Sequence, residues 1–371
     1  MKSIIITSLS PDSSASLPKY VESALRPYTK ITQVWPIQSR MKRLALIALT
    51  FHLDRKKWRD RLERESEHRL RTWLVYSSQL QSNPTVISSD CIMQIGLHFN
   101  SYPKDYCGGR YIYLHGTLSM LIGSHYDCQM WMPPNYEVGL WMDAERDVLA
   151  QADKVFVGSK FLVDILKNTY SVPEGKIVFA GTGAPPFGEY LPNEKKSDDT
   201  LRILFVGKDF ERKGGIYLLR AFHEIRKAIP KAKLIIVGPA SLPGGVQDGI
   251  EFRGRVDDRD EIRRLFLHAD VFAFPTLHDS FGFALLEAMY FGIPCIGTKI
   301  FAIPEIIDDG VTGLLVEPAN SIQLAQSIIS ILRDPEKRIR FGQAGRHVVE
   351  EKFSWNLVGS RIASVCEFSA L

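Results

Sequence analysis

The sequence predicts a protein of the α/β class, with two doubly wound parallel-sheet domains that face each other across a cleft. Its 371 residues exceed the size of one ordinary core. Short β-branched runs alternate with longer helical patterns almost throughout, as in parallel sheets covered by helices on both faces. A segment rich in glycine, proline and charge at 181–200 interrupts this alternation. We therefore expect a first Rossmann-like domain at 1–185, a linker at 186–200 and a second Rossmann-like domain at 201–371. Whether the last helix packs back on the first domain is left open.

Eleven apolar runs are the expected strands. They lie at 3–9, 30–35, 91–97, 110–116, 154–159, 176–181, 202–207, 233–238, 250–254, 271–275 and 294–298. Helices are expected between them, including 214–229, 260–268 and 281–291. Ligands of such sheets bind at the carboxyl ends of the strands, where loops meet helix N-termini. The functional residues should therefore lie in loops that follow strands.

Composition excludes several classes of protein. Hydrophobic residues make up 45% of the chain and charged residues 24%, which is an ordinary globular mixture. The apolar part of the first ten residues is too short for a signal peptide, and the run at 44–53 is too short to span a bilayer. The five cysteines form no CxxC pair and so support neither a disulfide framework nor structural zinc. We expect a reduced, cytoplasmic protein.

The positive charge is concentrated in one segment. The net charge is +4, but residues 40–71 contain 11 basic and 5 acidic side chains, so the rest of the chain is net negative. One interpretation is a solvated helix face with Glu and Arg at helical spacing. The other is a basic surface beside the apolar run 44–53, suited to an anionic membrane or a phosphorylated acceptor, with peripheral attachment to the inner membrane face. Nucleic acid is not an expected partner, because no binding motif accompanies the charge.

The segment FPTLHDSFGFALLEAMYFGIPCIGT, 274–298, carries the strongest chemical signal. Its helix is apolar nearly all round apart from Glu287, and a buried carboxylate needs a polar partner or a ligand. Asp279 stands eight residues earlier, which is ~12 Å along a helix. Between them lie the amides of Phe281, Gly282 and Phe283, which would hold a diphosphate at the positive end of the helix dipole. The alternative is that Asp279 only caps the helix and Glu287 lies at its solvent seam.

This segment resembles the E-x7-E signature of the retaining, GT-B-fold glycosyltransferases of family four, the glycosyl transferases group 1. The chain also resembles that family at 205–215, 252–276 and 303–318, in the family's order. The resemblance implies that Glu287 binds the ribose of a nucleotide sugar. It also implies that Asp279, a glutamate in the family, contacts the donor sugar.

The same resemblance implies a diphosphate clamp. Lys208 and Lys213 occupy the positions of a family arginine and lysine, and Lys208 lacks the planar fork of arginine. Gly207 allows close backbone approach. Alternatively, the two lysines form a solvated basic turn. The remaining positions implied to line the donor site are Val256 and Ser280.

In the first half, RYIYLHGTLSM at 110–120 resembles the strand-end histidine of the family, which implies that His115 lies near the donor sugar. The alternative is a core histidine that is hydrogen-bonded at a strand end. Asp258 and Asp260 form a DxD, the metal motif of other glycosyltransferases. They stand at a helix start, where acids stabilise the dipole without metal. The family generally needs no metal, and no cofactor is expected beyond a UDP- or GDP-sugar co-substrate.

The expected activity is transfer of a hexosyl group from a nucleotide diphosphate sugar to an acceptor hydroxyl, with retention at the anomeric carbon. The acceptor could be a glycan, a lipid-linked molecule or a small molecule. Two alternatives remain: a nucleotide-sugar epimerase or hydrolase of the same fold, and a non-catalytic nucleotide-sugar-binding protein. A non-catalytic protein could lose family residues, as this chain has at Asp279, which replaces a glutamate, and at Lys208, which replaces an arginine.

Overall fold

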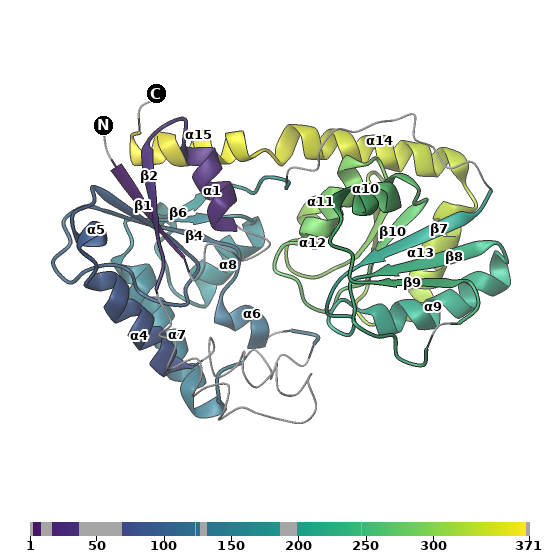
Figure 1. Cartoon of the computed structure of the whole chain (residues 1–371), viewed down its shortest axis with the longest axis horizontal. Helices are drawn as coiled ribbons and strands as arrows, with labels where there is room; N and C mark the ends of the chain where they lie inside the picture. Colours follow the sequence, from purple (N-terminus) through teal and green to yellow (C-terminus); the bar gives the residue numbers. More distant parts are fainter. Residues whose placement is uncertain are drawn as a thin grey trace. The chain divides into compact units, whose positions relative to one another are not determined.

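The computed structural model describes residues 3–8, 17–36, 69–122, 124–126, 132–185, 199–245 and 247–368. The chain forms two compact units (Figure 1). Unit 1 comprises Met1–Gly183 and Trp355–Leu371, and unit 2 comprises Ala184–Ser354. Most of the basic segment 40–71, the run 44–53 within it and all but the end of the expected linker lie outside the described residues.

Unit 1 is built on a six-stranded parallel sheet with the strand order β2-β1-β3-β4-β5-β6. Its strands are β1 Ser3–Thr7, β2 Lys30–Val34, β3 Cys91–Ile95, β4 Gly109–Leu114, β5 Lys154–Val157 and β6 Ile177–Phe179. Its helices are α1 Leu17–Leu25, α4 Leu70–Gln81, α5 Pro84–Ile87, α6 Leu118–Ile122, α7 Asn135–Gln151, α8 Lys160–Asn168 and α15 Trp355–Cys366, with a 3-10 turn, η2, at Glu174–Lys176.

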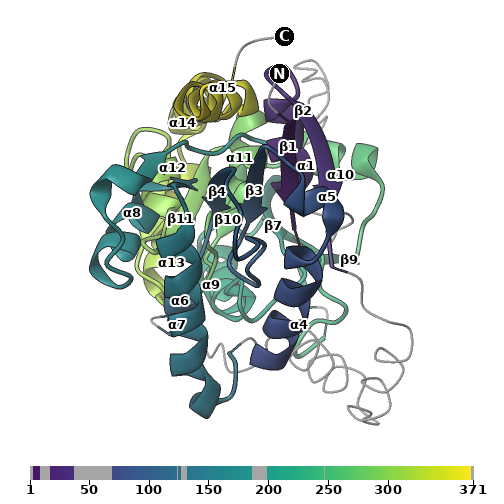
Figure 2. The same ribbon diagram turned by 90° about the vertical axis from the view of Figure 1, so that its left-hand side faces the viewer.

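One face of this sheet is covered by α1 and α15, which pack against each other although they come from opposite ends of the chain (Figure 2). Val21 and Leu25 of α1 and Ile362 of α15 are fully buried with Ile4 and Ile6 of β1 in one apolar cluster. The last helix is therefore part of the core of unit 1. It contributes to this core because its apolar stripe finds a matching surface on α1 and the sheet.

Unit 2 has a second six-stranded parallel sheet, with the order β12-β11-β10-β7-β8-β9. Its strands are β7 Leu201–Val206, β8 Ala232–Val237, β9 Ile250–Gly254, β10 Val271–Phe274, β11 Cys295–Thr298 and β12 Gly313–Val316. Its helices are α9 Gly215–Ala228, α10 Arg259–Leu267, α11 Phe283–Tyr290, α12 Ile303–Ile306, α13 Ser321–Leu332 and α14 Pro335–Lys352.

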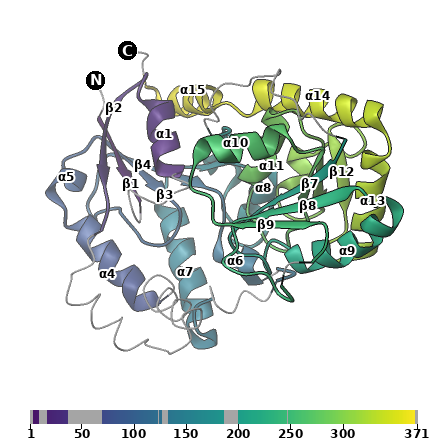
Figure 3. The same ribbon diagram turned by 45° about the vertical axis from the view of Figure 1, so that its right-hand side comes forward.

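Alternating residues of the unit 2 strands enter two separate apolar cores. Ile203 and Phe205 of β7 face α9 and α13, which pack together on one face (Figure 3). Leu204 of β7 and Phe272 of β10 face the opposite core, which includes residues of α10, α11 and α12. The sheet is thus covered on both faces, which explains why its strands read as continuous apolar runs.

All eleven expected strands are present, within a few residues at their ends, and the predicted α/β architecture is confirmed. A twelfth strand, β12, was not predicted, because four residues between two turns carry little periodic signal. The helix expected at 281–291 is shorter, at 283–290. It begins only after Gly282, because this N-cap residue adopts a left-handed conformation with φ of 99°. None of the described helices combines the length and apolar character that a bilayer crossing requires.

Candidate active site

The strand order of unit 2 places its functional loops at a topological switch point. From β7 the chain proceeds through β8 and β9 on one side, and β10, β11 and β12 lie on the other. Because β7 and β10 are adjacent and parallel, their following loops emerge side by side at the same edge of the sheet. Such a point is where open α/β sheets bind ligands. The lysines expected after β7 and the acid expected after β10 are thereby brought together.

The two loops are joined by one backbone hydrogen bond and one from a side chain to the backbone. The Leu277 amide donates to the Arg212 carbonyl at 2.8 Å, and the Arg212 guanidinium donates to the His278 carbonyl at 2.8 Å. Gly214 lies so close to Pro275 that a Cβ at this glycine would be 1.8 Å from the proline carbonyl oxygen. No other residue fits there, since φ at Gly214 is also positive, at 74°. The loops therefore form one rigid support for the side chains they carry.

Lys213 and Asp279 form an ion pair across these loops. Their side chains are only 14% and 17% exposed, and the Lys213 ammonium lies 4.9 Å from the centre of the Phe274 ring. Burial lowers the pKa of Lys213, and the charge of Asp279 opposes this effect. Burial alone would raise the pKa of Asp279, but Lys213, with smaller contributions from nearby groups, outweighs it and holds that pKa below its ordinary value. The Lys213 ammonium is thus poorly solvated and is paired with the Asp279 carboxylate.

Asp279 also caps the start of α11. Its Oδ1 atom accepts hydrogen bonds from the amides of Phe281 and Gly282, both at 3.2 Å. The sequence suggested that the amides of Phe281, Gly282 and Phe283 would be free to hold a diphosphate. This is wrong for Phe281 and Gly282, whose amides already donate to Asp279. The expected helical spacing of the two carboxylates is also wrong, because α11 begins at Phe283 and Asp279 precedes it in the loop.

Glu287 lies on α11 in a different environment. Burial raises its pKa to about 7, against the opposing charge of Arg259 at the start of α10. Within the described part of the chain this carboxylate forms no ion pair. A carboxylate with so little compensation costs free energy to ionise, and a hydroxyl-bearing ligand would supply the missing hydrogen bonds. This is the environment that the sequence predicted for Glu287.

The other predicted donor-site residues lie around this centre. A Cβ at Gly207 would be 2.9 Å from Cγ of Lys213, so this glycine leaves room for the lysine side chain. Lys208 follows it and is exposed. Val256 packs on the apolar core beside α10, and Ser280 is half-buried between Asp279 and the amides of the α11 cap. Lys208 and Lys213 thus have unequal surroundings, and only Lys213 is paired with the predicted acid.

His278 and Arg212 complete the immediate surroundings of the ion pair. His278 is buried, and its ring meets the Phe301 ring edge-on at 4.9 Å. Burial, assisted by the positive charge of Arg212, lowers the pKa of His278 to about 4, so this histidine is neutral at pH 7. Arg212 forms an ion pair with Asp209 at 3.3 Å. Arg212 and Lys213, and not His278, therefore carry the positive charge next to Asp279.

In unit 1, His115 directly follows β4, at the carboxyl end of the sheet. Its Nε2 atom lies 3.2 Å from the Tyr113 hydroxyl and 3.0 Å from Oγ1 of Thr182. This is the hydrogen-bonded strand-end histidine of the structural alternative. The two interpretations are compatible, since such a histidine still stands where a doubly wound sheet presents its functional groups.

The DxD motif has a structural role in α10. Asp258 is the N-cap residue, and its side chain accepts a hydrogen bond from the Asp260 amide at 2.9 Å. The predicted capping function is confirmed. Among the residues that the structure describes, no three His, Cys, Asp or Glu side chains are grouped so that they could hold a metal ion.

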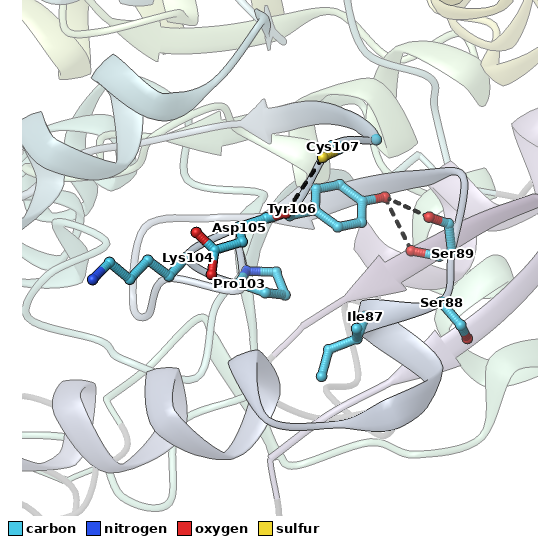
Figure 4. Close-up of a pocket in the computed structure, with 9 residues that line it drawn as sticks. Ile87, Ser88, Ser89, Pro103, Lys104, Asp105, Tyr106 and Cys107 are labelled. Carbon is cyan, nitrogen blue, oxygen red and sulfur yellow. Dashed lines mark hydrogen bonds between the residues drawn. The ribbon is translucent and has the colours of Figure 1, made fainter.

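Unit 1 contains a pocket of about 480 Å³ (Figure 4). It is lined by 87–89 and 103–108, segments that precede β3 and β4 and therefore belong to the amino ends of these strands. Tyr106 closes one side, donating a hydrogen bond to the Ser89 carbonyl at 3.0 Å. His115 lies at the opposite edge of this sheet, at the carboxyl ends of the strands, so the pocket is not part of the candidate site.

Sequence reasoning missed one buried acid, Glu145 on α7. It is 3% exposed and accepts hydrogen bonds from the Tyr170 hydroxyl and from the Leu118 amide, the latter at 3.1 Å. Burial raises its pKa to about 7 despite these donors. A signal was present, because Glu145 stands four residues from both Trp141 and Leu149 and so lies on the apolar stripe of its helix.

Together, the fold and the site define an α/β protein of two doubly wound units, with a charged loop pair at the switch point of the second. Residues 187–348 match the model of a family described as glycosyl transferases group 1. The second unit belongs to this family, and the resemblance predicted from the sequence is confirmed.

Similar proteins include sugar transferases. The chain is 32% identical over 208 residues to the phosphatidyl-myo-inositol mannosyltransferase of Mycobacterium leprae, covering 54% of both chains. It is 31% identical over 212 residues to a GDP-mannose-dependent monoacylated alpha-(1-6)-phosphatidylinositol monomannoside mannosyltransferase of Corynebacterium glutamicum, covering 53% of this chain and 55% of the relative. In both cases the match spans about half of the relative's length.

Solved structures are similar over the whole chain. Sucrose-phosphate synthase of Thermosynechococcus elongatus has a TM-score of 0.69 at 16% identity, covering 99% of this chain and 98% of that one. The Anabaena protein HepE in complex with UDP-glucose has a TM-score of 0.67 at 15% identity, covering 99% of this chain and 100% of that one. At these identities the similarity shows the fold, and the predicted GT-B fold is confirmed.

Proposed function

We propose that this protein is a retaining glycosyltransferase that moves a hexosyl group from a nucleotide diphosphate sugar to an acceptor hydroxyl. The observation that carries the proposal is the juxtaposition of Lys213 and Asp279 at the switch point of unit 2. A poorly solvated cation beside the start of a helix is suited to a diphosphate, and Glu287 on that helix is suited to a ribose diol. The family of the second unit supports this assignment.

The proposed chemistry is mainly electrostatic. As the bond between the anomeric carbon and the diphosphate oxygen breaks, its electron pair moves to that oxygen, and Lys213 stabilises the growing negative charge. The acceptor oxygen bonds to the anomeric carbon on the same face, and the leaving phosphate takes the acceptor proton. Atoms and charge balance without a protein nucleophile. In this scheme, Asp279 exchanges its contact with Lys213 for the donor sugar when the diphosphate binds.

UDP- and GDP-sugars are the donors to test first. A UDP-glucose complex is known for a protein of this fold, and GDP-mannose is named for a relative of this chain. A thermal-shift panel of nucleotide sugars would identify the donor, because a ligand that binds only the folded state raises Tm. Donor turnover with candidate acceptors, followed by assignment of the product anomer, then tests the reaction. A product of inverted configuration would contradict the proposal.

The same experiments distinguish the alternatives. Consumption of the donor at one rate with and without acceptors would indicate an epimerase or a hydrolase. Tight nucleotide-sugar binding with no turnover would indicate a binding protein. We expect full activity in EDTA, because the proposed charge stabilisation comes from Lys213. Loss of activity in chelator that magnesium or manganese restores would overturn the metal-independent mechanism.

The cellular location is also part of the proposal. We propose a cytoplasmic protein whose segment 40–71 binds the inner face of an anionic membrane weakly and reversibly at most, because its five acids dilute the positive charge. Basic residues near such a surface contribute ~1 kcal/mol each, screened beyond ~10 Å at 0.1 M salt. Flotation with anionic and neutral vesicles at low and high salt tests this attachment. If the protein ignores anionic vesicles at low salt, a soluble acceptor is favoured.

A further inference from the structure

The start of α6 depends on other elements of unit 1. This helix has only five residues and no acid in its first turn. The hydroxyl of Thr117, just before the helix, lies 2.9 Å from the Ser119 hydroxyl. So short a helix is not stable alone, and its first amides need acceptors from outside the helix.

Two buried side chains supply these acceptors. The Glu145 carboxylate on α7 accepts a hydrogen bond from the Leu118 amide, whose nitrogen lies 3.1 and 3.3 Å from the two carboxylate oxygens. The hydroxyl of Tyr170, just beyond α8, accepts from the Ser119 amide at 3.3 Å and donates its own proton to Glu145. Glu145 is 3% exposed and Tyr170 is 5% exposed. One connected pair of side chains thus holds the first two amides of α6.

Stability alone gives no reason for an acid at this position. Burial raises the pKa of Glu145 to about 7, although Tyr170 and the Leu118 amide oppose this effect. Ionising the carboxyl therefore costs free energy, and replacing such a buried polar pair by apolar side chains of similar shape is often neutral for stability. Apolar side chains could not accept from the α6 amides. The acid is therefore explained by the backbone that it holds.

We propose that Glu145 and Tyr170 are positioning residues that fix the loop 115–117, between β4 and α6, for ligand binding at the carboxyl end of the unit 1 sheet. At the start of this loop, the Leu114 carbonyl accepts a backbone hydrogen bond of 3.0 Å from the residue that follows β5. At its end, the Leu118 amide is held by the carboxylate. The short loop between these two attachments has little conformational freedom.

The consequence concerns how unit 1 meets its ligands. Loops at the carboxyl ends of the strands are where doubly wound sheets contact them. The positioning role rests on the proposed function, because that function places the reacting groups at this edge of the sheet. A loop that is already ordered does not lose conformational entropy when a ligand binds. Glu145 and Tyr170 act through the backbone of the loop and need not touch the ligand.

Backbone ¹⁵N relaxation of the full chain tests the positioning directly. In the unmodified protein we expect order parameters of about 0.85 at Leu118 and Ser119, as in rigid backbone. In Glu145→Ala both should fall below about 0.6, because Tyr170 also loses its acceptor, while Ile112 in β4 keeps its value. A general loss of stability would not produce this difference, since it changes how often the chain unfolds and not the order of the folded state.

Matched variants assign the effect. Glu145→Gln keeps an acceptor oxygen and should keep both amides ordered. Tyr170→Phe removes one hydroxyl and should lower the order parameter of Ser119 more than that of Leu118. Asp147→Asn changes an exposed acid on the same helix and should have no effect. Values of about 0.85 at both amides in Glu145→Ala would overturn the inference, and so would values below about 0.6 in the unmodified protein. If Glu145→Ala fails to fold, Tyr170→Phe decides alone.

Kinetics separate this inference from the proposed function. If transfer occurs, Glu145→Ala should lower kcat by about tenfold to 10²-fold, and Glu145→Gln should recover most of it. Affinity for the nucleoside diphosphate should stay unchanged, because its proposed site is in unit 2. If no transfer is found but the loop loses order in Glu145→Ala, the inference stands and the proposed function fails. If transfer is found with full kcat in Glu145→Ala, the proposed function stands and the inference fails.

Discussion

The loops that follow strands in the two units hold their functional side chains by different interactions. After β4 in unit 1, His115 is held by neutral hydrogen bonds to Tyr113 and Thr182. After β7 and β10 in unit 2, Lys213 and Asp279 form an ion pair. Both arrangements are poorly exposed and lie at carboxyl ends of parallel strands. The comparison shows that unit 2 holds its side chains by opposite charges and unit 1 by neutral hydrogen bonds.

Two acids with raised pKa values, the buried Glu145 and the half-buried Glu287, extend this comparison. Glu145 in unit 1 has two hydrogen-bond donors, whereas Glu287 in unit 2 is opposed only by the charge of Arg259. Burial raises the pKa of each to about 7. Glu145 holds the start of α6 through the Leu118 amide, so its interactions are complete within the chain. Glu287 has no ion pair among the described residues, and we propose that a ligand supplies its partner.

The largest effect is expected from Lys213→Ala, which removes the cation of unit 2. Turnover should fall ~10²–10³-fold, with a smaller loss of donor affinity, because negative charge grows on the leaving diphosphate. Breaking a buried pair also costs ~3 kcal/mol, since Asp279 stays buried without its partner. Steady-state kinetics and denaturant unfolding measure the two effects. The exposed Lys208 provides the matched control, and equal effects of Lys208→Ala and Lys213→Ala would contradict the comparison.

Glu145→Gln should change how stability depends on pH. The folded-state pKa of Glu145 is about 7, above the ordinary value of 4.5, so the folded state binds more protons between these pH values. The free energy of unfolding should therefore fall as pH rises from 4.5 to 7, by on the order of 3 kcal/mol. In Glu145→Gln this contribution should disappear.

Urea unfolding at pH 5 and pH 7.5 measures this difference. Glu145→Ala serves as the second variant. It should be destabilised at both pH values, because the Leu118 amide and the Tyr170 hydroxyl lose their acceptor. A parallel pH dependence in the unmodified protein and Glu145→Gln would show that this carboxyl is not the titrating group.

Glu287→Gln tests the corresponding acid of unit 2. An ionised carboxylate accepts stronger hydrogen bonds from a ribose than a protonated one, and the pKa of Glu287 is about 7. Nucleotide affinity should therefore rise with pH from 6 to 8. In Glu287→Gln it should be about 1.5–3 kcal/mol weaker above pH 8 and independent of pH. Calorimetric titration with the nucleoside diphosphate measures both, and unchanged affinity in a folded variant would refute the ribose assignment.

The smallest effect is expected from Asp258→Ala, which removes the N-cap of α10. The loss of stability should be about 1 kcal/mol, as for other caps. Asp258→Asn keeps an acceptor and should recover most of it. Neither variant should respond to magnesium. A variant whose activity falls and is restored by added metal would instead assign a metal-binding role to the DxD.

The residues determined the strands and much of the chemistry without tertiary information. Continuous apolar runs such as those of β7 and β10 can be satisfied only by burial on both faces, so their sequences imply covered parallel sheets. Glu287 was identifiable because it interrupts an apolar helix. The capping role of Asp258 was identifiable because a cap depends on residues two or three positions away.

Only the tertiary structure decided which of these residues meet. Lys213 and Asp279 are 66 positions apart and pair because β7 and β10 are neighbours at the switch point. Thr182 reaches His115 across 67 positions, and α15 joins the core of unit 1 from the far end of the chain. The start of α11 shifted to Phe283 because Gly282 adopts a positive φ. Local periodicity reports the burial of a segment, whereas strand order and long-range packing select its partners, and these depend on the whole chain.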